Sequence, residues 1–265
     1  MTDSVDIHKI SSKQNPWYKE LRDWTYVAGI HKTDNLIWLE GDHLCEAARL
    51  KGYLFQTVVF TDDCPMDLLQ AWSSVATKVV QIPLHLMKGL SSLQSAPMMA
   101  AVVSLPQTPL FNSSASAVVL DGLQDPGNAG SILRSAAAFG FKQCVTTPHS
   151  VGLWTHKVVR SAMGAHFSLD IIESVPIHLI QSSSLSVVLT SSHQGAYLDD
   201  LVADQILPWP IAWVFGHEGK GHSSTWTHMP CTTVRIRQPG GEESLNVAAA
   251  AAICMHASST QLSKK

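Results

Sequence analysis

Short apolar runs alternate along the chain with amphipathic stretches, and this pattern predicts strands and helices in turn. Before residue 104 the predicted strands are LIWLEG, TVVFTD and TKVVQIP. After residue 117 they are AVVLDGL, CVTTP, LSVVLTSS, IAWVFG and TVRIRQ. Strands that alternate with helices indicate an α/β fold. Because several strands are apolar throughout, a mostly parallel sheet covered on both faces is favoured.

The predicted helices have recognisable ends. Asn15 can cap the helix NPWYKELRDW, with Pro16 at its first position. Further predicted helices are HLCEAARLKG, DLLQAWSSV, SILRSAAAFG, WTHKVVRSAMGA and NVAAAAAICMHAS. Between the two groups of strands, SLPQTPLFNSSASA is rich in proline and serine and suits a linker. We therefore predict a small domain over 1–104, a linker over 105–117 and a larger domain over 118–265.

Composition restricts the class of protein. Of 265 residues, 45% are hydrophobic and 15% charged, which is typical of a globular chain with a core. The net charge of −3 counts mildly against bulk electrostatic capture of nucleic acid, although a local basic patch is compatible with it. The five cysteines form no C-x-x-C pair, which favours free thiols over disulfides or zinc. No apolar run approaches the ~20 residues of a membrane helix, and no secretory signal begins the chain, so we expect a cytoplasmic protein.

Three glycine-rich polar stretches follow predicted strands: DGLQDPGNAG, GHEGKGHSS and QPGGEESLN. Ligands of parallel sheets bind beyond the carboxyl ends of the strands, so the chemistry is expected there. A dinucleotide fingerprint and a G-x-S-x-G elbow are absent, and His222 stands where a P-loop needs lysine. The histidines lack metal-ligand spacing, so no metal site is predicted. A nucleotide-binding enzyme that uses GHEGKG on phosphates stays open as an alternative.

Three stretches together resemble one family. LDGLQDPGNAGSILRSAAAFG, VFGHEGKG and SLNVAAAAA resemble, in order, motifs one to three of the SpoU (TrmH-like) RNA 2′-O-ribose methyltransferases, which belong to the SPOUT class. The resemblance covers residues 117–262. The stretches ISSKQNPWYKELRDW and LIWLEGDHLCEAARLKG resemble the small L30e-like RNA-binding domain that many members carry. The resemblance implies a deep trefoil knot, S-adenosylmethionine as cofactor and a homodimer in which one subunit helps to complete the other's site.

The resemblance also implies residue roles. Cofactor contacts are expected from five positions: Thr190, Gly216, Gly219, Ile236 and Leu245. Polar site positions are expected at Asn128, Arg134, Glu218, Ser244 and Asn246. Since an arginine stays protonated, we expect Arg134 to clamp an RNA phosphate rather than act as a base. For Glu218, a role at the site and a role in holding its loop are equally favoured. Ser244 and Asn246 are expected to cap the last helix and to line the site.

The chain departs from the family pattern at Arg237, where many members have proline. This change predicts a looser cofactor loop, or an added RNA contact. A basic rim is expected from Lys142, Lys157, Arg160, Lys220 and Arg235. Trp154 and Trp226 are expected to be exposed, which is compatible with a dimer interface.

The predicted function is methylation of a ribose 2′-hydroxyl in structured RNA, with S-adenosylmethionine as donor and no metal. Ribosomal RNA of the 23S type is favoured over transfer RNA because of the L30e-like appendage. One alternative is a transfer RNA 2′-O-methyltransferase. Another is an RNA-binding module on the same scaffold that has lost catalysis, against which the intact polar positions argue.

Overall fold

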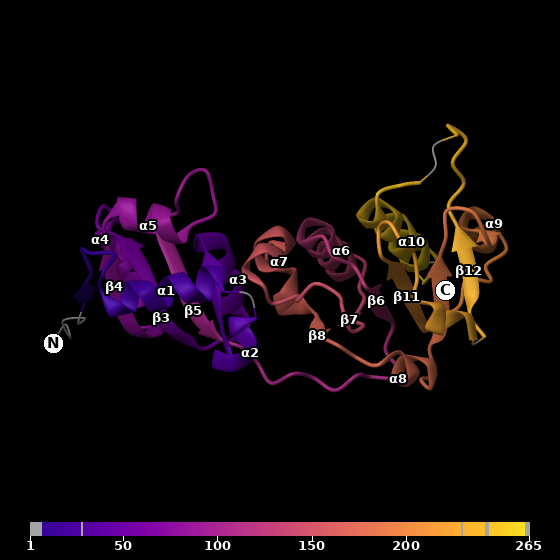
Figure 1. Ribbon diagram of the computed structural model, residues 1–265, viewed down its shortest axis with the longest axis horizontal. Helices are drawn as coiled ribbons and strands as arrows, with labels where there is room; N and C mark the ends of the chain where they lie inside the picture. The colour runs from indigo at the N-terminus through magenta and orange to yellow at the C-terminus, as the bar shows by residue number, and fades with distance from the viewer. Residues whose placement is uncertain (1–6, 28, 229, 242–243, 263–265) are drawn as a thin grey trace. The chain divides into compact units, whose positions relative to one another are not determined.

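The computed structural model describes residues 7–27, 29–228, 230–241 and 244–262 (Figure 1). Two compact units are present. The first contains Met1–Gln107 together with Trp154–Phe167, and the second contains Thr108–Leu153 together with Ser168–Lys265. The division at residue 107 falls inside the predicted linker. Segment 154–167, which the sequence prediction assigned to the larger domain, packs with the first unit, because Val159 and Phe167 belong to its apolar core.

A five-stranded sheet forms the first unit, in the order β1-β4-β3-β5-β2. Its strands are β1 (Ile7–Lys9), β2 (Leu36–Glu40), β3 (Phe55–Thr61), β4 (Ala76–Ile82) and β5 (Met99–Ser104). β5 runs antiparallel to both of its neighbours, while β1, β3 and β4 are parallel. The sequence patterns predicted β2, β3 and β4 but not β1 or β5.

Helices cover both faces of this sheet. They are α1 (Pro16–Tyr26), α2 (Ile30–Asp34), α3 (Asp42–Leu50), α4 (Met66–Ser73), α5 (Leu84–Leu90) and α7 (His156–Ala162). The Asn15 side chain caps α1 as predicted, since its oxygen accepts the Trp17 N–H at 2.9 Å. Neighbouring residues of one strand enter different cores: Val58 packs with α3 and α4, and Val59 packs with α1 and α5.

Seven strands build the sheet of the second unit, in the order β10-β12-β9-β11-β6-β7-β8. They are β6 (Ala117–Asp121), β7 (Gln143–Thr146), β8 (Asp170–Ile172), β9 (Ser186–Thr190), β10 (Ala196–Tyr197), β11 (Ile211–Gly216) and β12 (Thr232–Arg235). Neighbouring strands pair in parallel throughout the described part of this sheet, so the predicted mostly parallel α/β sheet is confirmed. The loops after β6, β9, β11 and β12 therefore reach the same edge.

The described helices of the second unit are α6 (Pro126–Ala138), α8 (Ile177–Gln181), α9 (Leu198–Ala203) and α10 (Val247–Leu262). The alanine-rich α10 packs against α6, α9 and β11, and Figure 1 shows α6 and α10 on the same side of this unit. Small side chains permit this close approach: Ala251 is fully buried. The sequence predicted a helix from Ser131, but α6 starts five residues earlier. Asp125 caps the helix and Pro126 occupies its first position.

Two tryptophans differ from expectation. Trp226, predicted to be exposed, is 1% exposed, and its indole N–H donates to Asp121 at 3.0 Å. Trp154 is half-buried against the core of the first unit. Within the described ranges, no helix combines the length and the apolar character needed to cross a membrane.

Candidate active site

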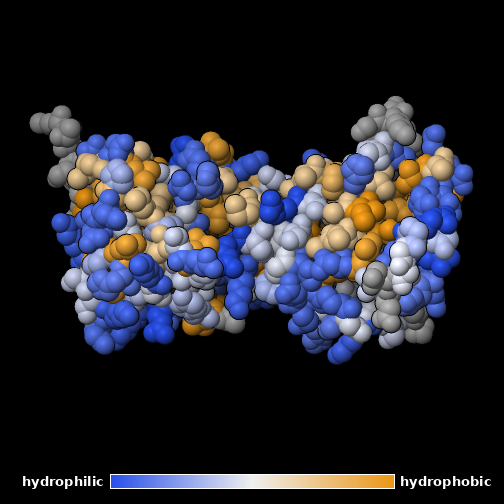
Figure 2. All heavy atoms as spheres, turned by 90° about the horizontal axis from the view of Figure 1, so that it is seen from above, coloured by the Kyte–Doolittle hydropathy of each residue, from blue (hydrophilic) through white to orange (hydrophobic). Residues whose placement is uncertain are grey.

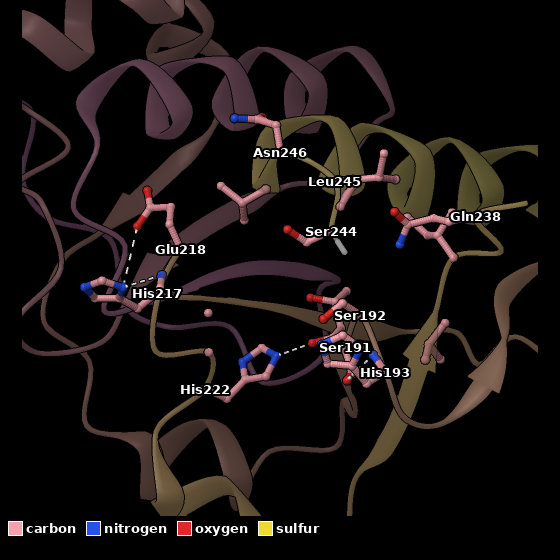
Figure 3. Close-up of a pocket in the computed structure, with 18 residues that line it drawn as sticks. Ser191, Ser192, His193, His217, Glu218, His222, Gln238, Ser244, Leu245 and Asn246 are labelled. Carbon is pink, nitrogen blue, oxygen red and sulfur yellow. Dashed lines mark hydrogen bonds and ion pairs between the residues drawn. The ribbon is translucent and has the colours of Figure 1, made fainter. Parts of the chain in front are cut away.

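A cavity of about 650 Å³ opens at the carboxyl edge of the second sheet (Figure 3). We call it the first cavity. Eight predicted site residues line it: Thr190, Gly216, Glu218, Gly219, Ile236, Ser244, Leu245 and Asn246. The other lining residues had no predicted role at the site: Ser191, Ser192, His193, His217, Gly221, His222, Val234, Gln238, Val247 and Ala250. Four of these residues, His217, Gly221, His222 and Gln238, belong to the glycine-rich polar stretches that follow predicted strands. Their position in these stretches is the sequence feature by which they could have been predicted. Glu242 and Glu243 of the third stretch lie outside the described residues.

The loop after β11 folds back on itself. His217 and Gly221 exchange two backbone hydrogen bonds, of 2.9 and 2.8 Å. A Cβ atom on Gly216 would lie 2.6 Å from the backbone carbon of Gly221, so this close approach requires glycine. The positive φ in the loop falls on Gly221, at +70°, rather than on Gly216 or Gly219. The loop continues into a 3₁₀ turn, Ser224–His228, and not into the α-helix that a P-loop needs.

A chain of hydrogen bonds joins the three motif loops. The Asn128 side chain donates to a Glu218 carboxylate oxygen at 3.1 Å and accepts from the Asn246 side chain at 3.0 Å. The same Glu218 oxygen accepts the Asp125 backbone N–H at 3.3 Å. Asn128 does not line the first cavity itself, but it fixes two residues that do. These hydrogen bonds hold the three loops in one arrangement. Neutral groups of Asp125 and Asn128 donate to the Glu218 carboxylate, and Asn246 donates to Asn128.

Asn246 has a second function as the cap of α10. Its side-chain oxygen accepts the backbone N–H groups of Ala248 and Ala249, at 2.9 and 3.2 Å. These are the donors that a helix start leaves unpaired. Ser244, predicted to share this capping, lines the cavity wall before the helix begins. Figure 3 shows Ser244 and Asn246 at the mouth of α10, above the loop that carries Glu218.

The Glu218 carboxyl is held in its ionised form. Partial burial acts to raise its pKa, but hydrogen bonds from its own backbone N–H, from Asn128 and from Asp125 outweigh burial, so the pKa lies below the ordinary value of 4.5. A carboxylate with a lowered pKa is a weak base. The geometry therefore favours the second predicted role, in which Glu218 holds its loop and orients Asn128.

Arg134 lies apart from this group. Its side chain is exposed on α6 and does not line the first cavity. It follows Asn128 by six residues, and at ~100° per residue this turns it about a third of the way around the helix. Arg134 therefore lies outside the lining of the first cavity, and its role at the site stays a prediction.

Two residues that line the first cavity carry buried acceptors without a partner. Among the described atoms, His222 Nδ1 and Gln238 Oε1 are buried and have no hydrogen-bond partner. His222 Nε2 lies 2.6 Å from the Thr190 carbonyl oxygen, so Nε2 carries the hydrogen and Nδ1 is a bare acceptor. Burial lowers the pKa of His222 below 6.5, which keeps the ring neutral. A ligand with amino groups would satisfy these acceptors, and S-adenosylmethionine carries two, so the lining fits the predicted cofactor.

Arg237, for which a looser loop or an RNA contact was expected, makes contacts within the chain. Its guanidinium donates to Asp199 at 2.9 Å and to Asp200 at 3.0 Å, and it stacks 3.8 Å from the Tyr197 ring centre. Arg235 stacks on the same ring at 3.9 Å. Two acids thus pair with Arg237 at the surface. These contacts join the segment that carries Ile236 and Gln238 to α9.

The described residues contain no group of three or more side chains that could hold a metal ion. The free cysteines Cys144 and Cys254 are buried, and burial raises the pKa of each thiol to about 12. At neutral pH these thiols are protonated and unreactive. The polar groups of the three loops are therefore the chemistry that the first cavity offers.

The second unit matches a family model. Residues 115–256 match the SpoU rRNA Methylase family. The chain belongs to the SpoU rRNA methylase family. The predicted membership of this family of methyltransferases is confirmed. The matched range contains every residue that lines the first cavity.

Relatives of similar length also match. The chain is 30% identical over 264 residues to an uncharacterised tRNA/rRNA methyltransferase of Synechocystis, covering 95% of this chain and 93% of that one. It is 24% identical to the 23S rRNA (guanosine(2553)-2′-O)-methyltransferase RlmP of Bacillus subtilis, covering 94% and 98%. Mitochondrial rRNA methyltransferase 3B of Danio rerio is 30% identical, but the chain spans about half of it, 54%.

Solved structures share the fold. The SpoU methyltransferase AviRb of Streptomyces viridochromogenes, in complex with the cofactor AdoMet, has a TM-score of 0.81 at 22% identity and covers 94% of this chain and 98% of that one. An AdoMet-bound rRNA methyltransferase of Sinorhizobium meliloti has a TM-score of 0.83 at 21% identity, covering 97% and 98%. At these identities the likeness establishes the α/β fold.

Proposed function

We propose that the chain transfers the methyl group of S-adenosylmethionine to a ribose 2′-hydroxyl of 23S ribosomal RNA. The observation that carries this proposal is the Glu218–Asn128–Asn246 chain of hydrogen bonds, which joins the three family motifs at the wall of the first cavity. RlmP, which is similar along nearly its whole length, is named for this reaction on 23S rRNA.

The first cavity suits the cofactor in size and lining. Its volume of about 650 Å³ is within the ordinary range of small-molecule sites. Ile236, Leu245 and the backbone at Gly216 would hold the adenosyl part, and His222 and Gln238 would accept its amino groups. When bound, S-adenosylmethionine supplies an electrophilic methyl group on a positively charged sulfur, which a ribose oxygen can take in one displacement.

The chain's own residues supply position more than proton transfer. Glu218 holds Asn128, and Asn128 is placed to hydrogen-bond the ribose beside the cavity mouth. Holding the two reacting groups together lowers a barrier by up to roughly 7–11 kcal/mol. Arg134 binds the phosphate next to the target ribose through its fork of donors, and this phosphate is the group nearest the departing hydroxyl proton.

Three further features of the family belong to this proposal. The segment before α10 passes beneath the loops after β9 and β11 to make a deep trefoil knot. In support, β12, β9 and β11 are neighbours and α10 packs on α6. The first unit is an L30e-like domain that binds the RNA. Its mixed sheet, covered by helices on both faces, agrees with such a module.

The active form is a homodimer joined through the outer face of α6 and α10. Figure 2 shows apolar residues gathered on the face of the second unit where these helices lie. On α10, Ile253 is 41% exposed. Since Arg134 is also exposed on α6, this arrangement brings the arginine of one subunit to the first cavity of the other.

A transfer assay tests the proposal. The full chain is incubated with methyl-labelled S-adenosylmethionine and an unmodified 23S rRNA transcript, and ribose methylation is mapped along the product. We expect label at one 2′-hydroxyl, lost in Asn128→Ala. A mixture of unmodified tRNA transcripts provides the second arm. Label on tRNA alone would show that the substrate is transfer RNA and not ribosomal RNA. Cofactor binding without transfer to either RNA would show that the chain is a non-catalytic module.

A further inference from the structure

A second cavity, of about 670 Å³, lies on the other side of the loop after β11. It shares His217, Gly221 and His222 with the first cavity. Its remaining walls come from the loops after β6 and β7, the start of α8 and the turn after His222: Asp121, Gly122, Thr147, Pro148, His149, Pro176, Ile177, His178, Lys220, Ser223, Ser224 and Thr225. None of the predicted catalytic or cofactor residues lines it.

Hydrogen-bond donors dominate the polar part of this cavity. Lys220 and His178 are exposed at its walls, as is His149, which the fold holds at φ +70°. His217 Nδ1 accepts the Gly219 backbone N–H at 3.0 Å, so its hydrogen is on the other nitrogen. Figure 3 shows that this other nitrogen points away from the first cavity. The cavity therefore offers an ammonium and several ring N–H groups.

The acid among its lining residues is already satisfied. Asp121 is 4% exposed, and its carboxylate accepts from the Thr147 hydroxyl at 2.9 Å, the Ser223 backbone N–H at 2.7 Å and the Trp226 indole N–H at 3.0 Å. Both oxygens of the Asp121 carboxylate therefore already accept hydrogen bonds from neutral donors of the protein. With this carboxylate satisfied, the Lys220 ammonium is the charged group left to bind a ligand, which favours an anion.

The walls are fixed and partly apolar. The Gln181 side chain of α8 donates to the Thr225 carbonyl at 3.3 Å, which joins two walls. Pro148, Pro176 and Ile177 give flat apolar surface beside the donors. A nucleotide has these two needs together, because its base packs on apolar surface while its phosphate takes hydrogen bonds.

We propose that the second cavity binds a nucleotide of the substrate RNA that flanks the methylated one. Its phosphate contacts Lys220 and His178, and its base lies against Pro148 and Pro176. The shared loop 217–222 then places the neighbouring ribose beside Glu218 and Asn128, at the mouth of the first cavity. This proposal rests on the proposed function, since it names where that RNA is held.

Substitutions at Lys220 test the site through RNA binding, which does not depend on methyl transfer. Binding of the 23S rRNA transcript to the full chain is measured by filter retention over a range of salt. In Lys220→Ala we expect a several-fold weaker affinity and a salt slope smaller by about 0.7 to 0.9, the value of one lost phosphate contact. Lys220→Arg should restore both, and the dissociation constant for S-adenosylmethionine should not change in either variant.

Lys142→Ala is the comparison variant, because Lys142 is an exposed lysine of the expected basic rim that lies outside both cavities. It measures the loss that a general basic surface would give, and this loss should be smaller than that in Lys220→Ala. A photocrosslink map adds a second readout: transcript containing 4-thiouridine should attach to peptides 147–149 and 176–178. Crosslinks only elsewhere, together with equal losses in Lys220→Ala and Lys142→Ala, would overturn the proposal. If the unsubstituted chain binds and crosslinks as expected but transfers no methyl group, the proposed function fails while the nucleotide site stands.

Discussion

At the residue scale, Asn246 combines a stabilising and a positioning role in one side chain, and two substitutions separate them. Asn246→Ala removes the cap of α10 and should lower the free energy of unfolding by about 1 kcal/mol. Asn246→Ser keeps a capping oxygen but loses the amide that donates to Asn128. We expect Asn246→Ser to unfold near the wild-type temperature while its kcat falls on the order of tenfold, because Asn128 is no longer oriented. Full activity in Asn246→Ser would show that the Asn128 contact is dispensable.

His222 gives the molecule a pH dependence with a defined sign. Burial lowers its pKa in the folded chain below the ordinary 6.5. As pH falls through about 6.5, His222 binds a proton in the unfolded chain but stays neutral in the folded chain. The stability linked to His222 is therefore complete above that pH and declines as pH falls toward the folded pKa, by at most about 1.4 kcal/mol per pH unit.

Melting temperatures of wild type and His222→Asn between pH 5.5 and 8 measure this effect. Other titrating groups act equally in both proteins and cancel in the difference. We expect the wild type to lose more stability than the variant on acidification. Parallel curves would show that the neutral His222 ring contributes no pH-dependent stability.

At the element scale, the pairing of β10 with β12 creates the Arg237 clamp beside the first cavity. Tyr197 of β10 is the register partner of Arg235, which brings the ring under both arginines. Arg237→Ala should therefore free the segment that carries Ile236 and Gln238 and raise the dissociation constant for S-adenosylmethionine several-fold, as calorimetry would detect. Arg49→Ala is the matched control, since Arg49 pairs with Glu46 and lies over Trp72 in the first unit. An equal affinity in both variants would refute a clamping role.

Elements with strong local signals were predictable, and pairings between distant elements were not. Apolar runs identified β3, β6 and β11, and the motif order identified eight of the 18 residues that line the first cavity. The two-residue β10 has too few positions to show a pattern, and the antiparallel direction of β5 depends on tertiary pairing. The clamp was missed for the same reason, because Arg237 and its acid partners are joined only by the fold. That Arg134 lies outside the first cavity follows from the rotation along α6, which the spacing of the motif does not show.

At the scale of the whole molecule, an exposed Arg134 and an Asn128 tied to the first cavity predict a site completed between two subunits. Arg134→Ala and Asn128→Ala are each expected to be inactive as pure proteins, since every site then lacks one group. Co-expression of the two variants produces mixed dimers in which one of the two sites has both groups. If the variants associate at random, about a quarter of wild-type activity should return, because half of the dimers are mixed and half of their sites are intact.

Light scattering and melting curves on each pure variant provide the control, since both must be folded and dimeric for the mixture to be informative. Arg134 is exposed on α6, so Arg134→Ala should fold normally. Activity that stays at background in folded, mixed dimers would place both groups in the same subunit. A return to about a quarter would instead explain why Arg134 is far around α6 from Asn128: the helix presents one residue to its own cavity and the other to the cavity of its partner.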